Sequence, residues 1–297
     1  MRINPAQTTD ILAAFDRIDN TQGVALRQLS SGVRVSMPGD DPADYALAVS
    51  NHAETTQNDQ FLQSCSSVQA GLATADSALS SVVSSLERAI TLGVSGANGT
   101  VSDSQKQAIA NEVLGIRQTV LNLANTSYHG TYVFAGTASN QTPFVADASA
   151  ASGIAYVGNS SSNQAAIGRN QMVATSLSGD QIFTTAGADV FAALQALADD
   201  LEGGSASDIG DATTQVRAAL DHVTNTRVFY GDTINRLEDS ESYLNNRNVQ
   251  LASEENDLIG TDMAATITKM SSAETAREST LAAVANMSSH TLFDYLK

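Results

Sequence analysis

The stretch "FLQSCSSVQAGLATADSALSSVVSSLERAI", residues 61–90, determines the fold class of this chain. Its apolar and small side chains recur at alternating steps of three and four, which is the spacing of one helix face. The residues on that face are Phe61, Cys65, Val68, Leu72, Ala75, Leu79, Val82, Leu86 and Ala89. No polar residue interrupts the series, so we predict a long helix that ends in the glycine-rich segment 93–100.

Further helices are predicted on the same spacing. The segment "SDSQ" from Ser102 supplies capping residues for a helix whose apolar face carries Ile109, Val113, Ile116, Val120 and Leu123. A short helix is expected at 189–201, and the longest periodic run covers 209–258. Because the face of that last run is partly polar, the helix needs partner helices in order to remain folded.

Two shorter apolar series lie near the ends of the chain. They consist of Ile11, Phe15, Ile18, Ala25 and Leu29 at one end, and of Met263, Ile267, Met270, Leu281 and Val284 at the other. Each is too short and too poor in large apolar residues to be stable alone. We therefore expect both ends to be mobile in the monomer and to become ordered on binding a partner.

The middle of the chain breaks the helical pattern. Short β-rich pieces at 132–135 and 154–157 are separated by clusters of Gly, Ser, Asn and Pro. The predicted fold is therefore mainly α with a small β insert, in which the two halves form a long antiparallel helical rod. The expected domains are a terminal coiled-coil domain ordered on assembly (1–44 plus 260–297), a helical rod domain (45–129 plus 186–259) and a small β-rich domain (130–185).

Composition and charge exclude several classes of function. The 297 residues contain 15 Lys and Arg against 32 Asp and Glu, a net charge of -17 that repels phosphate backbones and anionic lipid. We expect no nucleic-acid partner. The sequence has no run of 18 apolar residues, so we expect no membrane insertion. One cysteine cannot form an internal disulfide, and the N-terminal residues lack the features of a secretory signal peptide.

No arrangement of residues points to catalysis. The histidines at 52, 129, 222 and 290 lack the spacing of a zinc-binding helix, and Cys65 occupies an apolar helix face with no basic residue within a turn. Neither the P-loop spacing nor the dinucleotide fingerprint is present. We expect no cofactor, no metal site and no catalytic residue, and therefore a protein that is not an enzyme.

The segment "SSGVRVSMPGDDPADYALA", residues 30–48, has the composition of a connection between helices. Gly32 can adopt the left-handed conformation that ends a helix. Asp41 followed by Pro42 is suited to the start of the next helix, with a side-chain cap and proline at the first helical position. Asp40 is then expected to face Arg34 across the loop, in an exposed salt bridge worth about 0–1 kcal/mol.

These same residues carry a family resemblance. The stretch "LSSGVRVSMPGDDPADYALA" from Leu29 resembles the N-terminal signature of the flagellin family, in which a Leu-Ser-x-Gly-x-Arg run precedes a doubled Asp. Flagellin usually has Ala after the doubled Asp, so Pro42 favours the hook-associated branch of the family. "VLNLANT" at 120–126, "GTYVFAGTASNQTPF" at 130–144 and the C-terminal stretch from Gly260 to the final "LFDYLK" resemble that branch too.

The resemblance implies a structural subunit of the bacterial flagellum, an adaptor at the junction between hook and filament. Family members are exported unfolded through the flagellar type III apparatus without a cleaved signal peptide, which implies an extracellular location. The implied partners are other copies of the chain, a hook-associated protein on the hook side, flagellin on the filament side and an export chaperone.

The resemblance also implies where the chain assembles, because paired terminal helices form the inner tube in this family. The expected interface residues are Ile11, Phe15, Ile18, Leu29, Ile267, Met270, Leu281 and Val284, and the family signature of the joint is Gly32, Arg34, Asp40, Asp41 and Pro42. Each interface residue has an alternative role in packing within one chain. Two alternative functions remain open: a flagellin, or a secreted coiled-coil effector or enzyme whose activity resides in the β insert.

Overall fold

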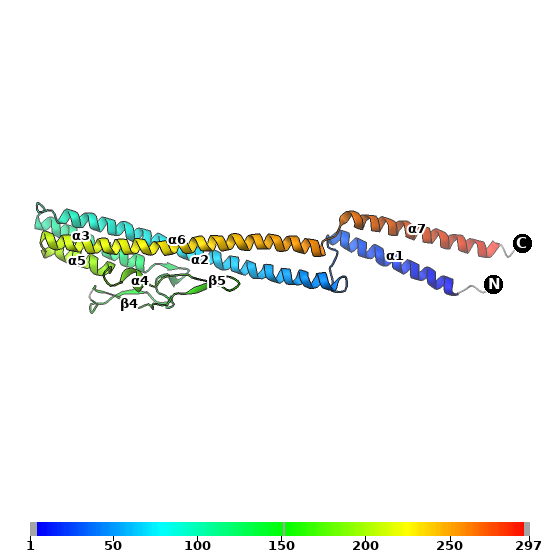
Figure 1. The fold of residues 1–297 in the computed structure, drawn as a ribbon, viewed down its shortest axis with the longest axis horizontal. Coiled ribbons are helices and arrows are strands. Elements are labelled where there is room, and N and C mark those ends of the chain that lie inside the picture. The colour runs from blue at the N-terminus through cyan, green and yellow to red at the C-terminus, as the bar shows by residue number, and fades with distance from the viewer. Residues whose placement is uncertain (1–4, 151, 294–297) are drawn as a thin grey trace. The chain divides into compact units, whose positions relative to one another are not determined.

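The computed structural model describes residues 5–150 and 152–293, with side chains described for 9–150 and 152–285. Contacts divide the chain into two units. Unit 1 extends to Thr56 and resumes at Arg247, whereas unit 2 is Gln57–Asn246. Both boundaries fall inside long helices, α2 (Pro42–Gly96) and α6 (Ala206–Ile259). The fold is mainly α with a small β insert, as predicted (Figure 1).

Two helices of unit 2 begin where the sequence predicts. Helix α3 (Asp103–Ala124) starts with a capping box, in which Ser102 caps the backbone of Gln105 and the Gln105 side chain accepts from Ser102 N. Helix α5 (Val190–Gly203) starts at Asp189, whose carboxylate accepts from the amide of Ala192 at 2.8 Å. Satisfying these free amides explains why each helix begins at that residue.

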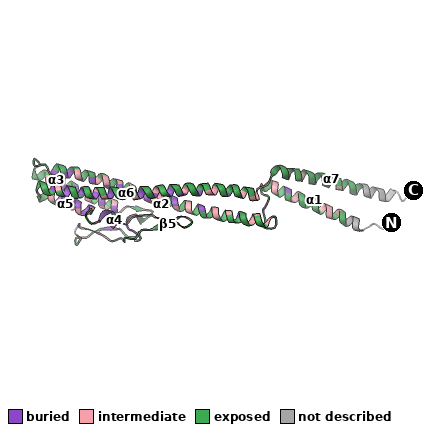
Figure 2. Cartoon of the chain, in the orientation of Figure 1, coloured by how far each residue is buried: buried purple, intermediate pink, exposed green. Residues whose placement is uncertain are grey.

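The predicted apolar faces form the core of unit 2. On α2 the side chains of Cys65, Leu72, Leu79 and Leu86 are fully buried. Most of the predicted face of α6 in unit 2 is buried too, including the polar Thr233 and Ser240, whereas Thr226 is half-buried. Figure 2 shows these buried residues along the inner faces of the helices. Among them Ser240 donates to the carbonyl of Ile167 at 2.8 Å, which satisfies a hydroxyl that would otherwise be costly to bury.

Helices α2 and α6 are antiparallel, as the predicted rod requires. In unit 2 the carboxylate of Asp76 accepts two hydrogen bonds from Arg227, at 2.8 and 3.0 Å, and Gln69 donates to Glu238. Along these contacts the residue numbers on α6 rise as those on α2 fall, so the two helices run in opposite directions. Arg88 on α2 forms an ion pair with Glu112 on α3 at 2.7 Å, and α3 packs on α5.

The β insert of unit 2 consists of three antiparallel strand pairs. They are β1 (Ser127–Tyr128) with β2 (Thr131–Tyr132), β3 (Phe144–Ala146) with β4 (Ile154–Tyr156), and β5 (Gln164–Gly168) with β6 (Gln171–Ala174). A short helix, α4 (Gly179–Phe183), follows. Strand β4 corresponds to the predicted piece at 154–157, but the pair formed by β5 and β6 has no counterpart among the predicted strands.

The predicted strand at 132–135 is wrong beyond Tyr132. Residues 133–135 form a turn, because Gly136 has a φ of 64° and the amide of Tyr132 bonds to the carbonyl of Ser139. The turn directs Phe134 inward, where its ring lies 5.4 Å from that of Phe183. The insert is thus held by an aromatic cluster, formed by Phe134, Phe144, Tyr156, Phe183 and Phe191.

This cluster is continuous with the helical core of unit 2. Phe134, Phe144 and Ile167 belong to the same group of buried side chains as Leu79 and Val216. Several of the chain's few aromatic side chains thus lie together, and the four phenylalanines of the cluster are fully buried between insert and helices.

In unit 1 the two terminal helices, α1 (Pro5–Ser31) and α7 (Met263–Phe293), lie side by side (Figure 1). The pairing of terminal helices with each other was predicted. The side chain of Arg277 on α7 reaches Asp19 at 3.9 Å and Gln22 at 3.4 Å on α1. Residues 294–297 of the "LFDYLK" ending, which was used for the family resemblance, lie outside the described residues.

The three predicted domains differ in their boundaries from the two units that the contacts define, and that division stays a prediction. Within residues 5–150 and 152–293, no helix is both long and apolar enough to cross a membrane.

Candidate assembly interface and helix joint

Two short connections of unit 1 meet beside the terminal helices. Residues 32–41 connect α1 to α2, and residues 260–262 connect α6 to α7. Val33 and Gly260 form an antiparallel β bridge. Around it the amide of Arg34 donates to the carbonyl of Ile259 at 2.6 Å, and the amide of Thr261 donates to that of Gly32 at 3.0 Å. We call these two connections, with the helix ends that they contact, the joint.

The local sequence explains how the joint begins and ends. Gly32 has a φ of 71°, the left-handed conformation predicted for the end of α1, and its amide donates to Gln28 O at 2.9 Å. Helix α2 begins at Pro42, as predicted. The carboxylate of Asp41 accepts from the amides of Ala43 at 3.2 Å and Asp44 at 3.3 Å.

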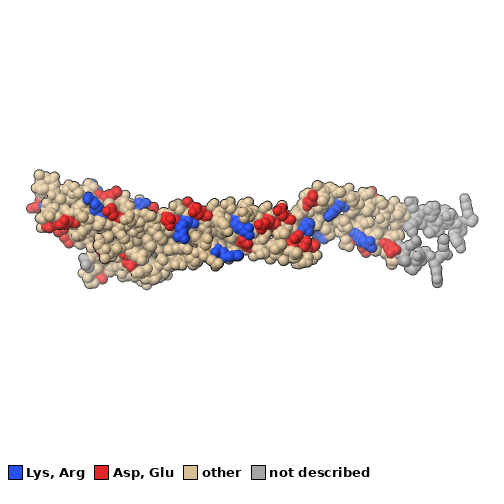
Figure 3. Space-filling model, viewed as in Figure 1, with Lys and Arg blue, Asp and Glu red and all other residues tan. Residues whose placement is uncertain are grey.

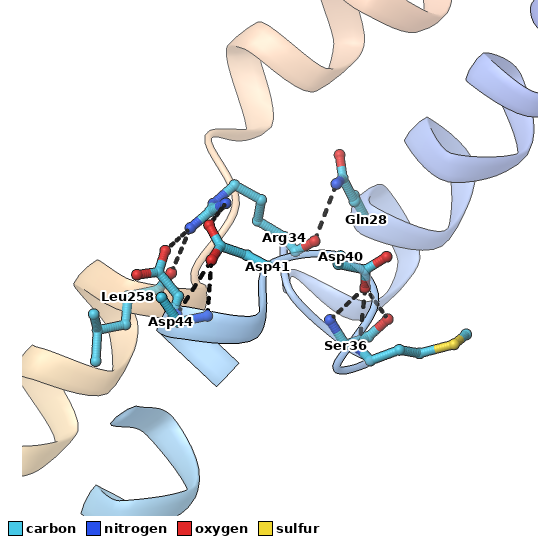
Figure 4. A network of polar contacts seen from close by, with 9 residues as sticks. Gln28, Arg34, Ser36, Asp40, Asp41, Asp44 and Leu258 are labelled. Carbon is cyan, nitrogen blue, oxygen red and sulfur yellow. Dashed lines mark hydrogen bonds and ion pairs between the residues drawn. The ribbon is translucent and has the colours of Figure 1, made fainter. Parts of the chain in front are cut away.

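The predicted salt bridge between Arg34 and Asp40 is wrong. The Arg34 guanidinium instead donates to the Asp44 carboxylate at 2.5 Å and to the carbonyl of Leu258 at 2.7 Å, and it lies 3.6 Å from Asp41 (Figure 4). Leu258 is in the last turn of α6, where backbone carbonyls lack partners within the helix. Arg34 thus connects the start of α2 to the end of α6.

The Asp40 carboxylate accepts hydrogen bonds from residues of its own loop. One carboxylate oxygen accepts from the amides of Ser36 and Met37, both at 3.0 Å, and from the Ser36 hydroxyl at 3.2 Å (Figure 4). These backbone hydrogen bonds lower the pKa of Asp40 below its ordinary value, because they stabilise the ionised form. The amide of Asp44, followed by that of Ala43, lowers the pKa of Asp41 in the same way.

A mainly apolar groove of about 410 Å³ lies next to the joint within unit 1. Its wall includes Val33, Val35, Tyr45, Val49 and Ile259. Val35 is buried, but Val49 is 52% exposed. The joint therefore presents apolar side chains that this chain does not cover.

The predicted interface residues fall into two groups. Six of them are half-buried in unit 1, where α1 packs on α7: Ile11, Phe15, Ile18, Leu29, Met270 and Val284. For these six, the packing within one chain that we considered as an alternative is present. The other two, Ile267 at 54% and Leu281 at 53%, are exposed on α7. At 100° per residue these two lie within roughly 40° of each other around the helix.

Sequence reasoning missed other exposed apolar residues of the terminal helices. Leu12 is 63% exposed and Leu26 is 55% exposed on one flank of α1, and Val24 and Met263 are exposed as well. These large apolar residues were visible in the sequence outside the predicted faces. Clusters of such residues at exposed helix positions are unusual, and they indicate a contact surface. The sequence analysis assigned one apolar face to each terminal helix. In the structure each helix has a packed face and also an exposed flank that carries apolar side chains.

The described residues do not suggest a cofactor or metal centre. Within residues 5–150 and 152–293 no group of three or more His, Cys, Asp and Glu side chains could hold a metal ion. Cys65 is buried, and burial raises the pKa of its thiol. On the face drawn in Figure 3, basic and acidic side chains are interspersed without a large basic patch.

Part of the chain matches a known protein family. Residues 12–139 match the bacterial flagellin N-terminal helical region, and this range includes the first connection of the joint with Gly32, Arg34, Asp40, Asp41 and Pro42. The chain is therefore similar to the flagellin family over the region that carries the signature residues.

Over most of its length the chain is similar to flagellar hook-associated protein 3. The protein of that name from Escherichia coli is 27% identical over 294 residues, which cover 91% of this chain and 91% of the relative. A flagellin of Listeria innocua is 27% identical over 256 residues, covering 84% of this chain and 83% of the flagellin.

A solved structure shares the fold. The flagellar junction protein FlgL from Legionella pneumophila superimposes with a TM-score of 0.63 over 72% of this chain and 100% of that chain, at 15% sequence identity. The fold predicted from the sequence is therefore confirmed.

Proposed function

We propose that this chain is a structural subunit of the bacterial flagellum that acts as an adaptor at the junction between hook and filament. The observation that carries the proposal is the similarity to hook-associated protein 3 over nine-tenths of both chains. The fold shared with the flagellar junction protein FlgL from Legionella pneumophila supports it. Flagellin remains the second candidate, because a flagellin relative also aligns over most of the chain.

The terminal helices provide the means of assembly in this proposal. Two α-helices alone bury only one face each, and here the flanks that carry Leu12, Leu26, Ile267 and Leu281 remain exposed. Burial of about 25 cal/mol per Å² of such apolar surface would favour association with neighbouring subunits. The neighbours are other copies of the chain, a hook-associated protein on the hook side and flagellin on the filament side.

The proposal includes export and the absence of catalysis. We infer that the chain leaves the cell unfolded through the flagellar type III apparatus, with an export chaperone, and that no signal peptide is cleaved. Hence its final location is extracellular, at the hook–filament junction. The lone, buried cysteine suits an extracellular chain that forms no disulfide.

The deletion phenotype tests the adaptor against the filament subunit. Cells that lack this chain should keep hooks and release flagellin into the medium, and a plasmid copy of the gene should restore filaments. Normal filaments in the deletion strain would contradict the junction assignment. Loss of filaments without released flagellin would favour the flagellin alternative, because the missing chain would then be the filament material itself.

The exposed flank of α7 can be tested separately. Ile267→Asp and Leu281→Asp should raise the concentration needed for assembly more than about tenfold, because a buried charge would replace an apolar contact. Ser279→Asp is the matched control, since Ser279 is exposed on the opposite side of α7. Assembly is measured by sedimentation and folding by circular dichroism. Equal assembly of all three variants would contradict the interface.

A further inference from the structure

The loop between α2 and α3 contains "NGT", residues 98–100. Asn98 is the only asparagine in the sequence that is followed by glycine. Its side chain is exposed, and Gly99 is exposed as well. An exposed Asn-Gly pair can cyclise, because the backbone nitrogen of the glycine lies one residue beyond the asparagine amide carbon and no Cβ blocks its approach.

The side-chain oxygen of Asn98 is held by two donors. The amide of Thr100 donates to Asn98 Oδ1 at 3.2 Å, and the Thr100 hydroxyl donates to the same oxygen at 3.0 Å. The first bond is that of an Asx turn, which folds the side chain back over the following residue. Attack on the amide carbon converts this oxygen to an oxyanion, and two preplaced donors stabilise such a charge.

The attacking group is free to react. Among the described residues the amide of Gly99 makes no hydrogen bond, whereas the amides of Asn98 and Val101 bond to Ser95 and Asn98 carbonyls. The nitrogen that must lose a proton is therefore exposed to water. The Asn98 backbone is held in place, which limits the entropy that the cyclisation must overcome.

We propose that Asn98 is a site of spontaneous deamidation in this protein. The deprotonated nitrogen of Gly99 bonds to Cγ of Asn98, and the bond from Cγ to Nδ2 breaks, so that ammonia leaves and a cyclic succinimide forms. Water then opens the ring at either carbonyl and yields aspartate or isoaspartate. The net change is loss of ammonia and gain of water, with no oxidant or reductant.

The product changes charge next to a helix start. A new carboxylate arises four residues before Ser102, the N-cap of α3, where the helix dipole favours negative charge. In the isoaspartate product the backbone gains one methylene group within the loop. The modification site thus adds negative charge at the connection of α2 and α3 as the protein ages.

Mass spectrometry of the intact, folded chain tests the proposal. Digestion with trypsin after incubation releases residues 89–106, a peptide in which Asn98 is the only asparagine. We expect ammonia loss and water gain at Asn98, with isoaspartate detected by an isoaspartate-specific methyltransferase. The rate should rise about tenfold per pH unit near neutrality, because the reacting nitrogen must be deprotonated.

The chain offers two matched controls. Asn159 also accepts two hydrogen bonds at Oδ1, from the amides of Thr137 at 2.8 Å and Ser161 at 3.3 Å, but Ser160 follows it. In Gly99→Ala a methyl group would meet no atom within 4 Å, so this variant should fold unchanged. Asn159 and Asn98 of Gly99→Ala should react roughly ten to a hundred times more slowly than wild-type Asn98, since access to the amide carbon is hindered.

The role of the fold is tested with a synthetic peptide of residues 89–106. If the two donors and the free amide assist the reaction, Asn98 in the folded chain reacts no more slowly than in the peptide. A folded chain that stays unmodified while the peptide reacts would overturn the proposal. An equal rate at Asn159, or an unchanged rate in Gly99→Ala with its melting temperature preserved, would do so too.

Discussion

The core of unit 2 and the terminal pair of unit 1 are both helical, but they differ in what their helices bury. On the α2 face of unit 2, Leu72, Leu79 and Leu86 are fully buried. Among the described side chains of α1 and α7, only Ala25, Thr266 and Ala273 are buried. The terminal pair therefore gains little from hydrophobic burial within one chain.

The difference shows how one sequence separates folding from assembly. A helix packed on several neighbours can bury a whole face, and its stability is then independent of other molecules. A two-helix pair leaves apolar flanks exposed, and here those flanks carry Leu12, Leu26, Ile267 and Leu281. The chain thus keeps apolar surface available where the proposed function needs contacts between subunits.

The largest expected difference between the two regions is in the free energy of unfolding after one apolar side chain in each is shortened to alanine. Leu79→Ala should lower the free energy of unfolding by about 2–5 kcal/mol, because it leaves a cavity in a fully packed site. Ile18→Ala should cost less than about 1 kcal/mol, because Ile18 is only half-buried. Urea unfolding of the monomers measures both. Equal losses would show that the terminal pair is as well packed as the core.

A smaller effect is expected at the joint, where Arg34 is 43% exposed. Arg34→Ala and Asp44→Asn should each loosen the joint, and a double-mutant cycle should give a coupling of about 0.5–1 kcal/mol that shrinks in salt. The readout is hydrogen exchange at the Arg34 amide, which bonds to Ile259. Arg34→Lys is the control that keeps the charge. Additive effects of the two changes would contradict a direct interaction.

The smallest expected effect is the change in the stability of the joint at acidic pH. The pKa of Asp40 lies below its ordinary value of 3.8, so its contacts stabilise the folded joint above that pH. This stabilisation is lost as the pH falls through the folded pKa. In an NMR titration the amide signals of Ser36 and Met37 should shift with a midpoint below 3.8, and Asp40→Asn should abolish the shift. A midpoint at or above 3.8 would contradict the contact.

Much of the helical fold could be predicted because its determinants are local and periodic. The faces of α2 and α6 followed from spacing alone, and the ends of helices at Gly32, Pro42 and Ser102 followed from conformational and capping preferences. The candidate site was predicted only in part. The six half-buried terminal residues lie on the faces that we counted, but the exposed flank with Leu12 and Leu26 does not.

Local sequence features were sufficient to predict the long helices, several of their starts and ends, and the resemblance to a family. They could not determine which acid Arg34 would contact. Asp40 bonds to amides three and four residues away, while Arg34 contacts Leu258, which is 224 residues away in the chain. Likewise Phe134, which was predicted to lie in a strand, lies in a turn and packs in an aromatic cluster with Phe183. Only the tertiary structure decided these contacts, because capping and periodicity act within a few residues, whereas pairing depends on which distant segments the fold brings together.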